Sequence, residues 1–219
     1  IVLQRGLYKK NFSDELVTGN VYLINKVDTV LLGKMTNGMK DGKWIKWNER
    51  GNKISETVYK KGKKDGQYTE YWNPSSGGKY RNDKKYGKWK EISGGGGVRY
   101  IEEGKYKDGL RDGIWTISRF SHIGPFRYVE EGEYKKGLKD GKWIQWYDKD
   151  KKIKKEETLF RNGKENGEYK EWYESGCLMR FSNKIVETNT RDYGDDGDGW
   201  TYQDQYLNNN FEYSNEGKV

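Results

Sequence analysis

The feature that most constrains this chain is a short frame of glycine and aromatic residues that recurs at fixed offsets. The frame is clearest in residues 131–147, which read EGEYKKGLKDGKWIQWY. The second of its two turn glycines has counterparts at intervals of 21 to 28 residues, at Gly42, Gly66, Gly87, Gly113, Gly141 and Gly167. An internal repeat is therefore the first property to interpret.

The other positions of the frame keep their distance from this glycine in all six copies. The first turn glycine stands four residues earlier, replaced once by Asp83. An aromatic residue or Met stands three residues before that, and another aromatic follows the second glycine by two. Because a one-residue slip would turn each side chain to the opposite face, such constancy predicts β-hairpins. We expect Gly137-Leu138-Lys139-Asp140-Gly141 to form the turn, since Asp-Gly is a common hairpin signal.

Composition alone would favour disorder, and the aromatic residues argue against it. Mean hydropathy is −1.21, with 32% hydrophobic and 35% charged residues. The 9 Trp, 18 Tyr and 6 Phe can each bury roughly 150–250 Å². We therefore predict an all-β fold, a linear array of hairpins forming an elongated, twisted antiparallel sheet in which rings pack from repeat to repeat. The expected packing residues are Tyr59, Tyr80, Tyr106, Tyr134, Phe160, Trp44, Tyr68, Trp89, Trp115, Trp143 and Tyr169.

Three regions follow from this frame. Residues 1–32 are expected to form a divergent first hairpin that caps the array, and residues 33–176 the array itself. Residues 177–219 are expected to be a degenerate repeat and polar C-terminal cap, with Gly194 and Trp200 as its remnants. Ser93 to Gly97 is interpreted as a flexible connector within the array. The Asp192–Asp198 cluster does not match a twelve-residue calcium loop, and whether it binds a cation is left open.

Few residues are available for catalysis or metal binding. His122 and Cys177 are the single histidine and cysteine, so an intrachain disulfide is impossible and the thiol gives no compartment. We expect Cys177 to be at least half-buried and His122 to lie in a solvated loop. The chain is predicted to have no enzymatic activity, metal site or cofactor. It shows no signal peptide or transmembrane run; Ile1 leaves open whether the N-terminus is processed, and localisation is not assigned.

A second row of rings follows the second glycine by five residues. By strand alternation it lies on the face opposite to the ring two residues after the glycine. This row is either a second packing surface or a recognition surface. The residues of this candidate interaction face are Trp47, Tyr71, Trp146 and Trp172.

The frame G-x-Y-x-x-G-x-x-D-G-x-W resembles the MORN repeat (membrane occupation and recognition nexus), in the variant form found in bacterial antitoxin-like proteins. The resemblance spans Leu7 to Tyr173, and the best copies are Gly104–Trp115 and Gly132–Trp143. It implies hairpin arrays that act as scaffolds, membrane-associated proteins or toxin-neutralising proteins. The third copy, with Asp83, and the last, with Glu165, depart from the pattern, so an identical ligand at every turn is not expected.

Three hypotheses for function follow. The first is a non-catalytic protein-binding module, in antitoxin or immunity form. The second is a structural protein that associates with itself into a homo-oligomer, filament or scaffold. The third is peripheral attachment to anionic lipid, because the formal charge is +8 and lysines crowd turns such as Lys60 to Lys64. Nucleic acid is disfavoured, since packing already explains the spacing of the rings.

Overall fold

The computed structural model describes residues 2–4, 7–10, 14–24, 29–71, 75–121, 128–184 and 211–212, and these contain strands and turns but no helix. Strands β1 (Val2–Gln4) and β2 (Leu7–Lys9) form a small sheet. Strands β3 to β17 form a second, fifteen-stranded sheet whose order is the order of the chain. The expected all-β array of successive antiparallel hairpins is confirmed.

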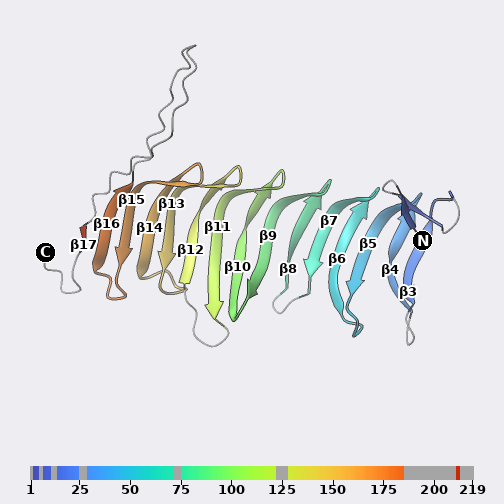
Figure 1. Cartoon of the computed structure of the whole chain (residues 1–219), viewed down its shortest axis with the longest axis horizontal. Helices are drawn as coiled ribbons and strands as arrows, with labels where there is room; N and C mark the ends of the chain where they lie inside the picture. Colours follow the sequence, from blue (N-terminus) through green and yellow to red (C-terminus); the bar gives the residue numbers. More distant parts are fainter. Residues whose placement is uncertain are drawn as a thin grey trace, which may run out of the picture. The chain divides into compact units, whose positions relative to one another are not determined.

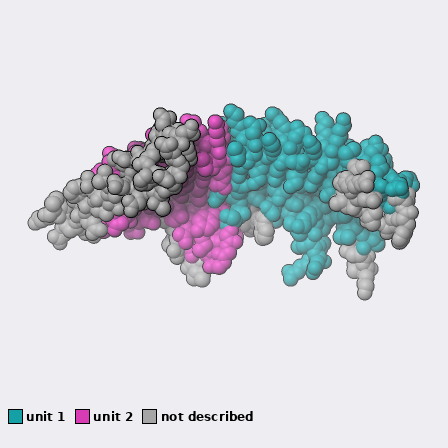
Figure 2. Space-filling view, turned by 45° about the horizontal axis from the view of Figure 1, so that its top comes forward, with its two compact units in different colours: residues 1–93, 102–110 teal, residues 94–101, 111–219 magenta. Residues whose placement is uncertain are grey.

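The chain divides into two compact units, which Figure 2 colours separately. Unit 1 comprises residues 1–93 and 102–110. From β4 to β8 each of its strands lies beside the strands that precede and follow it in the chain (Figure 1). Besides β1 and β2, its strands are β3 (Gly19–Ile24), β4 (Thr29–Thr36), β5 (Met39–Trp47), β6 (Lys53–Lys60), β7 (Lys63–Glu70), β8 (Ser76–Arg81) and most of β9 (Lys84–Gly95).

Unit 2 comprises residues 94–101 and 111–219 and follows the same plan. Strand β10 (Val98–Lys107) contributes residues to both units. The strands that belong largely or wholly to unit 2 are β11 (Leu110–Ser121), β12 (Tyr128–Lys135), β13 (Leu138–Trp146), β14 (Lys154–Arg161), β15 (Lys164–Trp172), β16 (Leu178–Lys184) and β17 (Phe211–Glu212).

The hairpin turns are shorter than the sequence suggests. Lys136 and Gly137 alone form the turn between β12 and β13, with φ of 52° and 85°. Both values are positive, as a two-residue hairpin turn of this type requires. The prediction that the turn extends to Gly141 was therefore wrong. Asp140 and Gly141 lie inside β13.

Gly141 serves a bulge instead of a turn. It has a φ of 71°, which favours glycine. Around it the register shifts, because Asp140 pairs with Glu133 whereas Ile144 pairs with Glu131. Extra residues on the return strand bend it and aim the following Trp143 across β12. Each of the two frame glycines thus has its own backbone role.

The ends and the connector also differ from the sequence-based expectation. Residues 1–32 do not form a single hairpin, because β1 pairs with β2 while β3 pairs with β4. At the other end β16 pairs with β15, so the array continues past residue 176. The expected connector is mostly strand, since β9 runs through Gly95 and only Gly96 and Gly97 form a turn.

The expectations for Cys177, His122 and the acidic cluster have different outcomes. Cys177 is exposed, contrary to the expectation of a buried thiol, because it lies in the short connection between β15 and β16. His122, Asp192 to Asp198, and Trp200 lie outside the described residues. The expectations about them stay predictions.

Candidate interaction surfaces

One face of each unit is built around tryptophans that cross a neighbouring strand. Trp44, Trp89 and Trp143 are buried, and each lies over a glycine of the preceding strand. A Cβ atom added at the glycine would come within 2.5 Å of the ring for Gly33, 2.4 Å for Gly78 and 2.2 Å for Gly132. Glycine is thus needed for close approach of the ring.

A hydrogen bond orients each of these indoles. The Nε1–H group of Trp44 donates to the carbonyl oxygen of Lys34 at 3.0 Å, and that of Trp89 to Lys79 at 3.0 Å. The Nε1–H group of Trp143 donates to the carbonyl of Glu133 at 3.1 Å. Because the polar atom of the buried indole has a partner, its burial carries no unpaired donor.

Two copies replace this glycine and tryptophan pair with a threonine and tyrosine pair. Thr57 is opposite Tyr68, and Thr158 is opposite Tyr169, in the cross-strand register. A larger residue on one strand thus accompanies a smaller ring on the other, which keeps the packed volume similar. The exchange is visible at fixed offsets in the sequence, but it is not among the predictions made from it.

The rings contact one another from hairpin to hairpin. In unit 1 Tyr80 meets Trp89 edge to face with ring centroids 5.0 Å apart, and Trp89 in turn meets Tyr106 at 5.9 Å. In unit 2 Trp143 meets Tyr134 at 5.0 Å and Phe160 at 6.3 Å, also edge to face. Such aromatic pairs add about 0.5–1.5 kcal/mol each beyond the area they bury.

Cations cover this ring ladder. The residue two before the second glycine lies over the tryptophan ring, with Lys40 at 4.5 Å from the Trp44 centroid and Lys139 at 3.9 Å from the Trp143 centroid. Burial, together with the charge of Lys64, lowers the pKa of Lys40. The ammonium group of Lys139 also pairs with Glu130 at 2.5 Å. A partner reaching this face would therefore meet cations and tyrosine edges before tryptophan.

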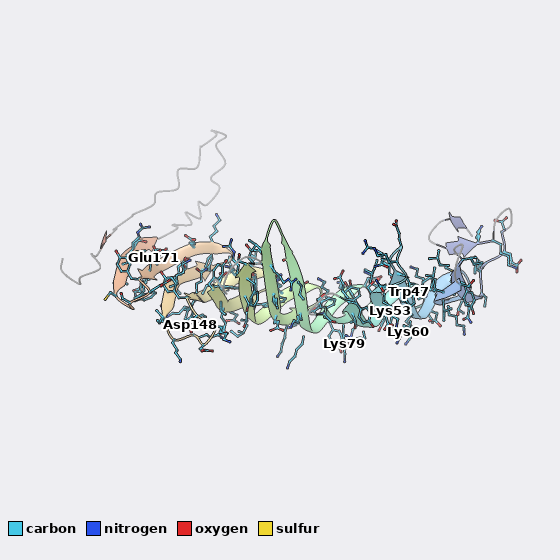
Figure 3. The ribbon with its side chains drawn as sticks, turned by 90° about the horizontal axis from the view of Figure 1, so that it is seen from below. Trp47, Lys53, Lys60, Lys79, Asp148 and Glu171 are labelled. Atoms are coloured by element: carbon cyan, nitrogen blue, oxygen red, sulfur yellow. The ribbon has the colours of Figure 1, made fainter. Side chains whose placement is uncertain are left out.

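The four residues of the candidate interaction face have unequal exposure. In unit 1, Tyr71 is 43% exposed, whereas Trp47 is half-buried and donates its indole hydrogen bond to the Leu31 carbonyl at 3.3 Å. Lys53 lies beside Trp47, 5.7 Å from its ring (Figure 3). In unit 2, Trp146 is only 8% exposed and Trp172 is half-buried. Of the four rings of the candidate interaction face, only that of Tyr71 offers much free surface.

A more exposed apolar surface lies at the β3 end of unit 1. We define the β3 edge as Tyr22, Leu23 and Ile24 together with Leu31 of β4, which is opposite Tyr22 in the register. Ile24 is 78% exposed and the other three are 43–50% exposed. In the described part of the chain β3 pairs with β4 alone, and its six residues contain neither charge nor proline. The usual protections of an edge strand are therefore missing there.

Metal-binding side chains do not gather in the part of the chain that the structure describes. Among the described residues there is no group of three or more His, Cys, Asp and Glu side chains that could hold a metal ion. In the same residues no helix is long and apolar enough to cross a membrane. Comparison with protein-family models and with curated protein sequences found no match.

Proposed function

We propose that the chain is a non-catalytic protein-binding module that receives its partner at the β3 edge. The carrying observation is the exposure of Tyr22, Leu23 and Ile24 on a strand with one unpaired side. An unpaired strand offers a row of backbone donors and acceptors, and the alternating side chains beside it supply selectivity. Among the described strands, β1, β2 and β17 are also paired with a single strand, but they have only two or three residues each, so the six-residue β3 is the place where another strand can best be added.

The resemblance to the MORN variant gives this module a concrete form. In that form the partner is a toxin-like protein, and binding at the β3 edge blocks its action. The cation-covered ring ladder then acts as a scaffold that holds the edge strand in place. The burial of Trp44 beside Val17 and Met35 supports a structural role for the ring ladder, because these three residues form the packed cluster under the first hairpins.

Photo-cross-linking in the cells that produce the chain tests the proposal. A photoreactive amino acid replaces Ile24 on β3 in one variant and Ile114 on β11 in a matched control. Both isoleucines are strongly exposed, at 78% and 60%, but Ile114 lies on a strand inside the sheet order. We expect one dominant protein adduct at position 24 and none at position 114. Equal adducts at both positions, or none at position 24, would contradict the proposal.

The same edge favours a second candidate, pairing with another copy of this chain. A strand that can accept a foreign strand can also accept β3 of a second molecule about a two-fold axis. In that case the dominant adduct at position 24 is the chain itself. The mass of the purified protein separates the two candidates before any partner is known.

A further inference from the structure

One cation over the ring ladder of unit 1 is buried without a carboxylate beside it. Lys40 is half-buried, and its ammonium group lies 4.5 Å from the centroid of the Trp44 ring and 5.0 Å from that of Tyr59. Burial, and then the charge of Lys64, lower the pKa of Lys40, and no described carboxylate opposes this shift. A half-buried ammonium group near another cation is unfavourable until an anion joins it.

Later copies of the repeat show what accompanies the same cation elsewhere. Lys85 is the equivalent residue on β9, 4.6 Å from the Trp89 ring, and its ammonium group pairs with the carboxylate of Glu91. Burial lowers the pKa of Lys85 too, but the hydrogen bond to Glu91 outweighs burial and the net shift is upward. On β13 the equivalent Lys139 pairs with Glu130. In these copies a carboxylate of the chain itself neutralises the cation.

The sequence explains why Lys40 differs. Glu91 follows Lys85 by six residues, whereas the residue six after Lys40 is the exposed Lys46. Lys46 is opposite Ser55 in the register, so the neighbouring strand supplies no carboxylate at this point either. Across the six copies a cation occurs at this position once, in the set Lys46, Glu70, Glu91, Ile117, Gln145 and Glu171.

A second half-buried lysine lies close to Lys40. Lys64 is opposite Tyr59 in the register, and Tyr59 is the ring that Lys40 also covers. Glu70 follows Lys64 by six residues, but it accepts a hydrogen bond from the hydroxyl of Ser76 at 3.4 Å and makes no described ion pair with Lys64. Two cations therefore flank this ring, and neither is paired with a carboxylate in the described part of unit 1.

We propose that Lys40, Lys46 and Lys64 bind a carboxylate from an acidic segment of another protein. This carboxylate takes the role beside Lys40 that Glu91 has beside Lys85, which is why we infer a carboxylate and not a phosphoryl group. The charge of unit 1 favours such a segment, because the unit has 22 Lys and Arg against 13 Asp and Glu. The site lies on the ring ladder and not at the β3 edge, so its failure would leave the edge proposal unaffected.

Titration of the full chain with a hexaglutamate peptide tests the site at low salt, where charges are weakly screened. The reporters are the indole N–H signals of Trp44 and Trp89 in NMR spectra. We expect the Trp44 signal to shift and saturate and the Trp89 signal to stay, because Glu91 already neutralises the cation over Trp89. Lys40→Gln should weaken the Trp44 response several-fold. The matched control Lys43→Gln removes the same charge from the opposite face of β5 and should leave the response unchanged.

Three further variants add or remove the internal carboxylate. Lys46→Glu places a glutamate at the position equivalent to Glu91 and should abolish the Trp44 response, whereas Lys46→Gln should keep a weakened one. Glu91→Gln should make Trp89 respond to the peptide. Equal Trp44 responses in the two Lys46 variants, or no Trp44 response in the unchanged chain, would overturn the proposal. If inorganic phosphate shifts the Trp44 signal more than acetate does at equal concentration, the site takes a phosphoryl group and the proposal is wrong.

Discussion

The indole of Trp143 lies directly over the backbone of Gly132, and an added Cβ atom there would come within 2.2 Å of the ring. The Nε1–H group of the same indole donates to the next carbonyl along, that of Glu133, at 3.1 Å. Position 132 therefore requires glycine, because the indole ring leaves no room for a Cβ atom. The same relationship links Gly33 with Trp44 and Gly78 with Trp89.

A double-mutant cycle tests whether a smaller ring at position 143 compensates for a larger residue at position 132. Gly132→Thr should lower the free energy of unfolding by about 1–3 kcal/mol, because the new side chain meets the indole. Adding Trp143→Tyr should restore part of that loss, since it recreates the pair seen at Thr158 and Tyr169. Urea denaturation of the four proteins gives the coupling energy. Additive effects of the two substitutions would contradict direct compensation.

Removing the ring altogether should weaken the array locally. Trp143→Ala is expected to lower the free energy of unfolding by about 3–5 kcal/mol, the usual range for a buried Trp. Trp143 is 2% exposed and its ring contacts Tyr134 and Phe160, so amide exchange should rise first in β12 and β14. Hydrogen exchange followed by mass spectrometry measures this. A uniform rise from β4 to β16 would argue against stability that is set by neighbouring hairpins.

Adjacent carboxylates on β14 should respond oppositely to pH. Burial raises the pKa of Glu157, but hydrogen bonds from Lys142 and Lys154, both at 2.7 Å, outweigh burial and the net shift is downward. Burial also raises the pKa of Glu156, and there the net shift is upward despite a hydrogen bond from Thr158. Glu157 therefore stabilises the fold above its ordinary pKa of 4.5, and this contribution is lost as pH falls through its lower folded value.

Two isosteric substitutions separate these effects. Glu157→Gln should lower the free energy of unfolding at pH 7 by about 1–3 kcal/mol, the range for hydrogen bonds to charged groups. Its effect should shrink at about pH 3. Glu156→Gln should leave stability at pH 7 unchanged or higher, because it removes a carboxylate whose charged form the fold disfavours. Urea denaturation at both pH values measures this, and equal losses in the two variants would show that the opposite shifts are absent.

Alkaline titration should show that Tyr68 ionises late, as should Tyr169, whose pKa burial also raises. Burial, then the charge of Glu70, raises the pKa of the Tyr68 phenol from 10.0 to about 12. Between these values the unfolded chain releases a proton that the folded chain keeps, so the free energy of unfolding falls as pH rises. Tyrosinate absorbance of the native protein should show a late rise that is smaller in Tyr68→Phe. A variant whose titration matches that of the unchanged chain would contradict this assignment.

The fold could be predicted because glycine and aromatic offsets specify register. A strict distance between Tyr134 and Trp143 places both rings on one face only in a hairpin, and the structure has them 5.0 Å apart. The turn was wrongly predicted to include Gly141, because the sequence Asp140-Gly141 is compatible with two backbone structures. An Asp-Gly pair suits a hairpin turn, and a glycine with positive φ also suits a bulge. Only the pairing of Asp140 with Glu133 distinguishes these cases.

The exposure of the candidate surfaces was harder to predict from the sequence. Trp146 was expected on an accessible face, yet it is largely buried because its partner strand and neighbouring side chains cover it; Lys151 lies 5.1 Å from its ring. Exposure depends on such neighbours across the sheet, which offsets along one strand do not reveal. The residues of the β3 edge are visibly apolar in the sequence, but their exposure follows from the strand order, which places β3 at the end.

Light scattering tests most directly whether the β3 edge serves another protein. The measurement is a dilution series of the purified chain at about 0.5 M salt, where exposed charges are screened. The variant Ile24→Lys is measured beside it, chosen because Ile24 is exposed whereas Val21 packs against the core cluster. The account predicts a mass of 25.8 kDa at every concentration for both proteins. A mass that grows with concentration, and returns to that of one chain in Ile24→Lys, would show that the edge binds a second copy and would contradict it.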